Sequence, residues 1–256
     1  MCLYLVIVSC SRDSSVEGNQ NLTMSDQNIV TFSVNGVSFK MIQVHGGTFT
    51  MGATNEQIAD AYENEKPPHP VTLSSFSIGE TEVTQSLWRA VMERNPSHFS
   101  GSIRPVENVS WDDCMEFITN LNALTGESFR LPTEAEWEFA ARGGNESRGY
   151  KYSGSNTIDD VAWYIFNSNS ATHNVATKQP NELGIYDMSG NVSEWCSDSY
   201  SRYSSSAQSN PVGSGIGNPV FRGGYWNEFP KSCRNSSRNY GGKTYRNISH
   251  GVRLAL

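Results

Sequence analysis

The stretch Arg130-Leu131-Pro132-Thr133-Glu134-Ala135-Glu136-Trp137-Glu138 determines the local fold in the middle of the chain. Thr133 and Glu136 stand at the spacing of a capping box, in which the threonine hydroxyl accepts from one helix-start amide and the glutamate accepts from another. Trp137 and the alanines that follow recur at helical spacing, and Gly143-Gly144 ends the pattern. The stretch therefore predicts a short helix that begins after Thr133 and buries one face.

Upstream of this stretch the sequence predicts two more helices and several strands. Thr84 can cap a helix whose apolar face begins with Leu87 and Trp88. Ser110 can begin a second helix, which Gly126 closes. Ordered structure is expected to begin near Val30. Strands are predicted at residues 39–44 and 48–52, joined by a tight glycine turn, and at residues 71–78.

The downstream half has a different composition. After Gly144, turn-forming residues recur every few positions and no helix is predicted, although Trp163, Trp195 and Trp226 lie there. Over all 256 residues, 37% are hydrophobic and 18% are charged, with 22 Gly and 10 Pro. These proportions favour a loop-rich α+β domain, large enough to bury a core, over a helical bundle or a disordered chain. The net charge of −7 and the lack of a basic cluster argue against nucleic-acid binding.

The N-terminal segment predicts a membrane anchor. An apolar run ends in Ile7-Val8-Ser9-Cys10, which resembles the lipobox of a bacterial lipoprotein. We therefore expect residues 1–10 to be a lipoprotein signal acylated at Cys10, residues 11–29 a flexible tether, and residues 30–256 one domain. The domain would then work in the cell envelope, facing the periplasm or the outer membrane. The alternative is a chance cysteine in an unstructured terminus.

Seven short motifs, in a fixed order, carry a resemblance to one family. The chain is similar to the formylglycine-generating enzyme (sulfatase-modifying factor) family across nearly all of residues 40–256. The resemblance implies a C-type-lectin-like fold with little regular secondary structure. The motifs are Gly46–Gly52, Glu80–Thr84, Pro105–Trp111, Arg130–Glu138, Asp187–Trp195, Arg222–Gly224 and Gly251–Arg253.

The resemblance also bears on activity. Catalytic members oxidise a cysteine of a sulfatase peptide to formylglycine with oxygen and a copper(I) ion held by two cysteines, since soft Cu(I) prefers thiolates. Counting forward from Arg222 places Cys233 at the second of these cysteines and Glu228 at the first. Counting backward from Gly251 instead aligns Arg234 and Arg238 with the family's paired arginines. In neither register are both thiols present, so we expect copper binding and oxidase activity to be lost.

Cys233 has a second interpretation, as a structural residue. The chain holds five cysteines and no C-x-x-C pair. Cys196 and Cys233 are one candidate disulfide, which would stabilise the loop-rich half in an exported protein. Cys114, on the apolar face of a predicted helix, is expected to be a small core residue.

The family resemblance further implies calcium. Asp187 and Glu194 would supply side chains, and Met188, Gly190 and Val192 would supply main-chain carbonyls, because hard Ca²⁺ prefers six or more oxygens. The alternative is a surface loop with two free acids. A weaker second site would use Asn167 and the carbonyl of Asn169.

Two functions remain open on the sequence. The first is a binding or accessory module without oxidase activity, which holds a peptide, glycan or protein partner in the family's groove. Trp226, Tyr225 and Trp195 could line that groove, although such aromatic residues more often belong to a core. The second is a formylglycine-generating oxidase with a degenerate metal site. The scattered histidines and the lack of an H-x3-H pair argue against an iron-dependent relative.

Overall fold

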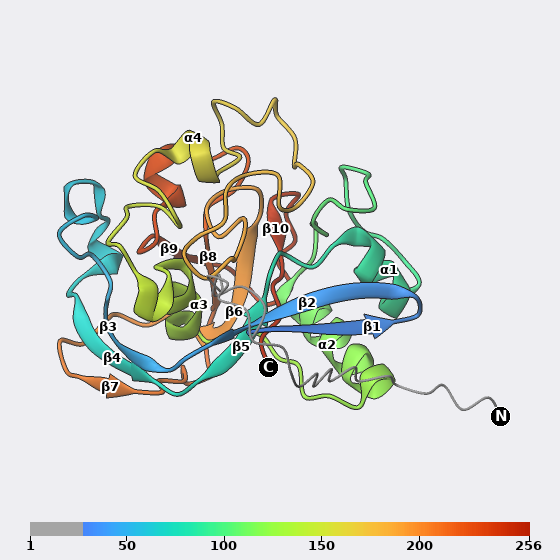
Figure 1. Cartoon of the computed structure of the whole chain (residues 1–256), viewed down its shortest axis with the longest axis horizontal. Helices are drawn as coiled ribbons and strands as arrows, with labels where there is room; N and C mark the ends of the chain where they lie inside the picture. The colour runs from blue at the N-terminus through green and yellow to red at the C-terminus, as the bar shows by residue number, and fades with distance from the viewer. Residues whose placement is uncertain (1–27) are drawn as a thin grey trace, which may run out of the picture.

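The computed structural model describes residues 28–256, in which small sheets and short helices are joined by long loops (Figure 1). The loop-rich α+β organisation predicted from composition is confirmed. The helices are α1 (Gln85–Met92), α2 (Trp111–Thr125), α3 (Glu134–Ala141) and the single turn α4 (Ile158–Val161). The strands are β1 (Ile29–Val34), β2 (Val37–Val44), β3 (Gly47–Met51), β4 (His69–Leu73), β5 (Phe76–Gly79), β6 (Ser193–Ser199), β7 (Gln208–Ser209), β8 (Pro219–Arg222), β9 (Arg238–Tyr240) and β10 (His250–Gly251).

The strands form three sheets of order β1-β2-β5, β3-β4-β7 and β10-β6-β8-β9. The predicted strands at 39–44 and 48–52 exist, yet β2 and β3 lie in different sheets. A Cβ at Gly46 would be 2.4 Å from the Leu73 carbonyl oxygen, so the glycine permits the chain to cross closely between the sheets. The strand predicted at 71–78 is interrupted at Ser74-Ser75, where the chain passes from the second sheet to the first.

The predicted helix starts are confirmed. Thr84 accepts a hydrogen bond from the Leu87 amide, and Ser110 forms a capping box with Asp113. Thr133 and Glu136 form the predicted capping box of α3. Each of these contacts satisfies amides that the first helical turn leaves without a partner.

The core consists of two large clusters and a small one. Helices α1 and α2 pack with β1 and β2 around the first, which contains Trp88, Phe117 and Trp195. Helix α3 packs against β3, β6 and β8 around the second, with Trp137 at its centre. The small cluster includes Tyr152, Val161, Tyr164 and Cys233. This small cluster lies in the loop-rich half of the chain. The same half also forms the sheet β10-β6-β8-β9, whose strands the sequence pattern did not predict.

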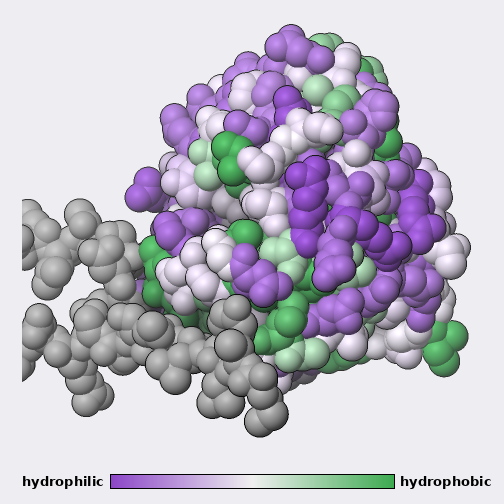
Figure 2. Space-filling model, turned by 90° about the vertical axis from the view of Figure 1, so that its right-hand side faces the viewer, coloured by the Kyte–Doolittle hydropathy of each residue, from purple (hydrophilic) through white to green (hydrophobic). Residues whose placement is uncertain are grey.

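The face that carries α1 and α2 is mainly hydrophilic where it is visible, with hydrophobic residues in small groups (Figure 2). Within residues 28–256, we find no helix that combines the length and apolar character needed to cross a bilayer. The predicted signal at 1–10, its Cys10, and residues 11–27 of the tether lie outside the described residues.

Candidate functional site

A cleft of about 500 Å³ lies beside the end of β8, and we call it the Arg222 cleft. One wall is the loop Tyr62–Asn64, and the opposite wall comes from β8, the turn that follows it, and β9. The lining is mostly polar or aromatic. It comprises Tyr62, Glu63, Asn64, Phe221, Arg222, Gly223, Gly224, Tyr225, Glu228, Ser232, Ser237, Arg238 and Asn239.

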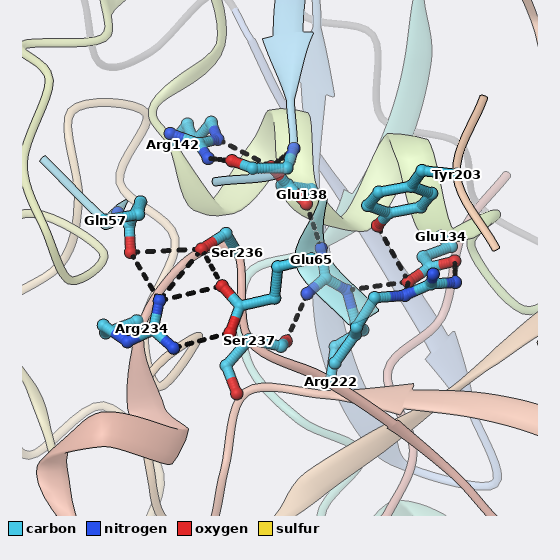
Figure 3. Close-up of polar contacts among 12 residues, drawn as sticks. Gln57, Glu65, Glu134, Glu138, Arg142, Tyr203, Arg222, Arg234, Ser236 and Ser237 are labelled. Carbon is cyan, nitrogen blue, oxygen red and sulfur yellow. Dashed lines mark hydrogen bonds and ion pairs between the residues drawn. The ribbon is translucent and has the colours of Figure 1, made fainter. Parts of the chain in front are cut away.

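Three buried arginines lie in and beneath this cleft, each paired with a buried glutamate (Figure 3). Arg234 binds Glu65 through two contacts of 2.8 and 2.6 Å, a bidentate geometry that fixes both side chains. Arg238 binds Glu134 at 2.5 Å. Arg222 binds Glu138. Arg234 and Arg238 are the arginines that counting backward from Gly251 aligned with the family's pair. In the structure each forms a buried ion pair with a glutamate of this chain.

The same pairs hold the far wall of the cleft in place. The Tyr62 amide donates to Glu65 at 2.8 Å, and Asn64 exchanges side-chain and main-chain hydrogen bonds with Arg238 at 3.1 and 3.2 Å. Two polar atoms of the lining residues, Asn64 Oδ1 and Arg222 Nε, are buried without a hydrogen-bond partner among the described residues. Neither atom is open to a ligand, because both are buried and Arg222 Nε lies 3.4 Å from Glu134 Oε1. The cleft therefore has walls that buried ion pairs and hydrogen bonds hold in place.

Cys233 lies behind this cleft and not in its lining. Its side chain is fully buried, and a Cβ at Gly224 would stand 2.8 Å from its sulfur. Burial, reinforced by the nearby Glu228 carboxylate, raises the pKa of the Cys233 thiol to about 12. Because nucleophilic and metal-binding cysteines react as thiolates, this environment does not suit the catalytic role considered for Cys233.

Glu228 occupies the cleft position that the forward register assigned to the missing cysteine. Its carboxylate lies close enough to Tyr225 and to Cys233 to contribute, after burial, to the raised pKa of both side chains. A hard carboxylate beside one buried, protonated thiol does not form the paired soft ligands that Cu(I) requires. The residues at this site therefore do not fit copper.

The predicted disulfide between Cys196 and Cys233 is wrong. Both are free thiols in the structure. Cys196 lies on β6 in the cluster around Trp137, whereas Cys233 belongs to the small cluster with Tyr152 and Tyr164. Cys114 is free and fully buried beside Phe117, as expected for a core residue.

The aromatic groove differs from the prediction. Trp195 is fully buried, and its indole N–H donates to the Val109 carbonyl at 3.1 Å, so it is a core residue. Trp226 is 8% exposed, packs edge-on against Phe99 and lines neither the Arg222 cleft nor the pocket beside it that contains Tyr245. Of the three predicted groove residues, Tyr225 alone lines the cleft. It also lines an adjoining pocket of about 570 Å³, which we call the Tyr245 pocket.

Sequence reasoning missed much of the lining. Tyr62 and Asn64 come from a loop far away in the chain, and no motif marked them. Tyr245 and His250 line the Tyr245 pocket. The signal available for that region was the run of Tyr, Asn and Gly between residues 239 and 247, a composition common in binding surfaces.

The predicted calcium loop is tightly turned, with positive φ at Asp187, Gly190 and Asn191. Asp187 and Glu194 are buried, together with Glu82 of the β5–α1 loop. Burial, strengthened by the charges of Asp187 and Glu194, raises the pKa of Glu82 well above its ordinary value. Burial also raises the pKa of Asp187 to about 6.

These three carboxylates share one guanidinium, that of Arg253. Both Glu194 oxygens accept from Arg253 at 2.7–3.0 Å, and one also accepts from the Trp137 indole at 2.6 Å. Asp187 Oδ2 accepts from the Ala176 amide at 2.7 Å. The excess negative charge suits a divalent cation, but Glu194 is already saturated with donors. Within 28–256 no three His, Cys, Asp or Glu side chains group as metal ligands, so the calcium site of Asp187 and Glu194 stays a prediction.

The weaker calcium set is not assembled for a metal. Asn167 Oδ1 accepts from the Tyr164 amide at 2.9 Å, and its Nδ2 donates to the Ala162 carbonyl at 2.9 Å. The carboxamide of Asn167 therefore closes its own loop. Asn169 adopts a φ of +53° in the following turn.

Comparisons with known proteins agree with this fold. Residues 31–256 match the family model described as the sulfatase-modifying factor enzyme 1-like domain. The chain is 34% identical to the chaperone protein LppX of Paenibacillus barcinonensis, over 76% of this chain and 79% of that protein. It is 30% identical to the serine/threonine-protein kinase Pkn1 of Chlamydia trachomatis over 84% of its own length, which is 38% of the kinase.

Among solved structures, Treponema denticola variable protein 1 superposes with a TM-score of 0.81 at 34% identity, covering 89% of this chain and 98% of that one. The resemblance inferred from the ordered motifs is confirmed. The chain belongs to the FGE-sulfatase family of sulfatase-modifying factor enzyme 1-like domains.

Proposed function

We propose that this domain is a binding or accessory module that has no oxidase activity and holds a protein, peptide or glycan partner in the Arg222 cleft. The observation that carries the proposal is the pairing of Glu228 with a buried, protonated Cys233 where catalytic relatives need two thiolates. The cleft around them is nevertheless retained, with buried ion pairs fixing its walls. A relative named a chaperone, LppX, supports a role other than oxidation.

The first test concerns oxidation. A sulfatase peptide that contains Cys-x-Pro-x-Arg is incubated with the protein, copper and oxygen, and a formylglycine-generating enzyme with both cysteines is run in parallel. We expect no change in the mass of the peptide cysteine with this protein. Conversion of that cysteine would instead establish the alternative function, a formylglycine-generating oxidase.

A variant sharpens this test. Glu228→Cys restores a thiol at the forward-register position, and we expect thiolate–copper absorption with Cu(I) in the variant and none in the wild type. Absorption in the wild type would contradict the proposal. Binding is tested with peptide and glycan libraries, where Tyr62→Ala should weaken a ligand of the cleft and Arg94→Ala, on the α1 side of the fold, should not.

We further propose that the domain is lipid-anchored through Cys10 in the cell envelope and that a calcium ion stabilises the Asp187 loop. The lipobox-like sequence supports the anchor, and the excess of buried carboxylates over guanidinium supports the cation. Incorporation of labelled palmitate by the wild type, and its loss in Cys10→Ser, tests the anchor. Equal labelling of the two proteins would refute it.

A further inference from the structure

The Tyr245 pocket adjoins the Arg222 cleft and has a different chemistry. Five of its lining residues are aromatic, and none of the described residues that line it is Asp, Glu, Lys or Arg. The complete lining is Phe221, Tyr225, Asn239, Tyr240, Gly241, Gly242, Tyr245, Asn247 and His250.

The rings are arranged around His250. Its imidazole centroid lies 4.3 Å from that of Phe221, 5.5 Å from Tyr245 and 6.0 Å from Tyr225, at interplanar angles of 41–70°. Tyr240 and Tyr245 are 45% and 46% exposed, so parts of these rings face solvent. Phe221 and His250 are buried, so the ring surfaces that a ligand reaches most readily in this pocket are those of Tyr240 and Tyr245.

The polar groups around these rings disfavour an anion and favour a cation. Ring faces carry negative electrostatic potential, which attracts cations and repels anions. Burial and the negative charge of the neighbouring Glu228 carboxylate raise the pKa of Tyr225, and that charge beside the pocket also favours a cation over an anion. His250 Nδ1 lies 2.6 Å from the Ser193 hydroxyl, and burial lowers the His250 pKa to about 4, so the imidazole adds no positive charge at neutral pH.

We propose that the Tyr245 pocket binds an alkylated ammonium cation, such as a quaternary ammonium head group or a methylated lysine side chain. Quaternary ammonium groups are the ligands that cages of aromatic side chains recognise in other proteins. The pocket, at about 570 Å³, has room for such a group. The inference refines the proposed binding role and rests on it in one respect, since Tyr225 lines both the pocket and the Arg222 cleft.

The probe is choline, and its matched control is 3,3-dimethyl-1-butanol, which has the same shape without the charge. Binding to the full chain is measured by calorimetry and by NMR saturation transfer to the probe's methyl groups. We expect choline to bind at least about fivefold more tightly than the neutral control, because each well-placed ring adds a cation–π attraction. Trimethyllysine and acetyl-lysine peptides form a second pair, which distinguishes a protein source of the cation from a choline source.

Two variants place the site. Tyr245→Leu keeps bulk and removes a ring, and we expect it to weaken choline binding about threefold or more. Tyr62→Leu makes the same change in the Arg222 cleft and should leave choline binding unchanged. The Tyr62 ring already has a cation over it, since Lys231 Nζ lies 4.0 Å from its centroid. Because both tyrosines are partly exposed, neither change should unfold the domain.

Several outcomes would overturn the inference. Equal affinity for choline and its neutral isostere would make the pocket an apolar site, and no binding of either would remove it as a cation site. Binding of methyl glycosides in place of choline would assign it to carbohydrate. A loss of choline binding in Tyr62→Leu, with Tyr245→Leu unaffected, would move the site to the Arg222 cleft. None of these results bears on oxidation, so they leave the first test of the proposed function independent.

Discussion

Removing one partner of the Arg234–Glu65 pair should destabilise the domain strongly. Both side chains are fully buried, and the guanidinium is the one cation bonded to this carboxylate among the described residues. In Arg234→Met, the Glu65 carboxylate keeps the Tyr62 amide and the Ser236 hydroxyl but loses its countercharge. A buried charge left without its partner destabilises a protein by about 3–5 kcal/mol. For a domain of this size, that corresponds to a melting temperature lower by about 6–20 °C.

The pH dependence of this effect follows from the pKa of Glu65. In the wild type, burial acts to raise this pKa, but Arg234 and its neighbours outweigh burial and hold it below the ordinary value. The pair therefore contributes stability that is present above the unfolded-state pKa and is lost as pH falls through the folded-state pKa. In the variant, burial without Arg234 raises the pKa of Glu65, so the folded state takes up a proton more readily than the unfolded state. The destabilisation of Arg234→Met relative to wild type should consequently be smaller at pH 5 than at pH 7.

The assay is urea unfolding followed by tryptophan fluorescence at both pH values. The matched control is Arg94→Met, which breaks a pair with Glu116 whose side chains are 59% and 56% exposed and should change stability by less than about 1 kcal/mol. In Arg234→Met/Glu65→Gln neither position carries a charge, so no buried charge is left without its partner there and the double variant should be more stable than Arg234→Met alone. Equal losses in Arg234→Met and Arg94→Met, independent of pH, would refute the reasoning.

Three further predictions concern calcium, pH and backbone space. If calcium binds the Asp187 loop, excess EDTA should lower the melting temperature of calcium-saturated protein, since a ligand at a hundred times its Kd stabilises by about 2.7 kcal/mol; an unchanged transition would remove the ion from the proposal. His250 has a folded-state pKa of about 4 against an ordinary 6.5, so the unfolded state binds its proton first and stability should fall as pH drops from 6.5 to 4, on the order of 3 kcal/mol. In His250→Gln the stability should fall less steeply between pH 6.5 and pH 4 than in the wild type. Asp187, whose raised pKa changes stability in the opposite direction, contributes equally to the wild type and the variant. Parallel profiles of stability against pH for the two proteins would count against the role of His250. Gly224→Ala should destabilise the domain and disturb the cleft, because φ at Gly224 is +69° and the added Cβ would lie 2.8 Å from Cys233 Sγ. Gly242→Ala is the control, since a Cβ there would meet no atom within 4 Å. Similar urea midpoints for the two variants would contradict the packing argument.

The features predicted correctly from the sequence were those set by near neighbours in the chain. A helix cap needs residues three positions apart, and Thr84, Ser110 and Thr133 all cap as expected. Membership of the family was also predicted correctly, because the seven short motifs stand in the family's order along the chain. Strand pairing was not, because β2 and β3 are adjacent in sequence yet do not pair with each other: β2 pairs with β1 and β5, and β3 pairs with β4 in another sheet.

The errors at the candidate site have the same origin. Glu65 and Arg234 are 169 residues apart, so no local pattern could join them or place Tyr62 in the cleft. Trp195 was expected in a groove because aromatic residues often line one, but it lies on β6, which neighbouring strands and the core enclose. The predicted disulfide was wrong because sequence position does not show which cysteines meet in the fold. Cys196 and Cys233 belong to separate hydrophobic clusters.

The structure separates the residues that hold the cleft from those that a ligand would touch. The buried pairs of Arg222, Arg234 and Arg238 connect the C-terminal segment to α3 and to the 57–65 region, and they add to the sheet β10-β6-β8-β9 in holding the loop-rich half together. Tyr62, Tyr240 and Tyr245, by contrast, are 40–46% exposed. Because exposed side chains away from such networks change stability little when substituted, the lining can vary while the frame persists. Glu228 in the cleft and the buried Cys233 behind it can therefore differ in chemistry from one relative to another without loosening the walls that the ion pairs hold.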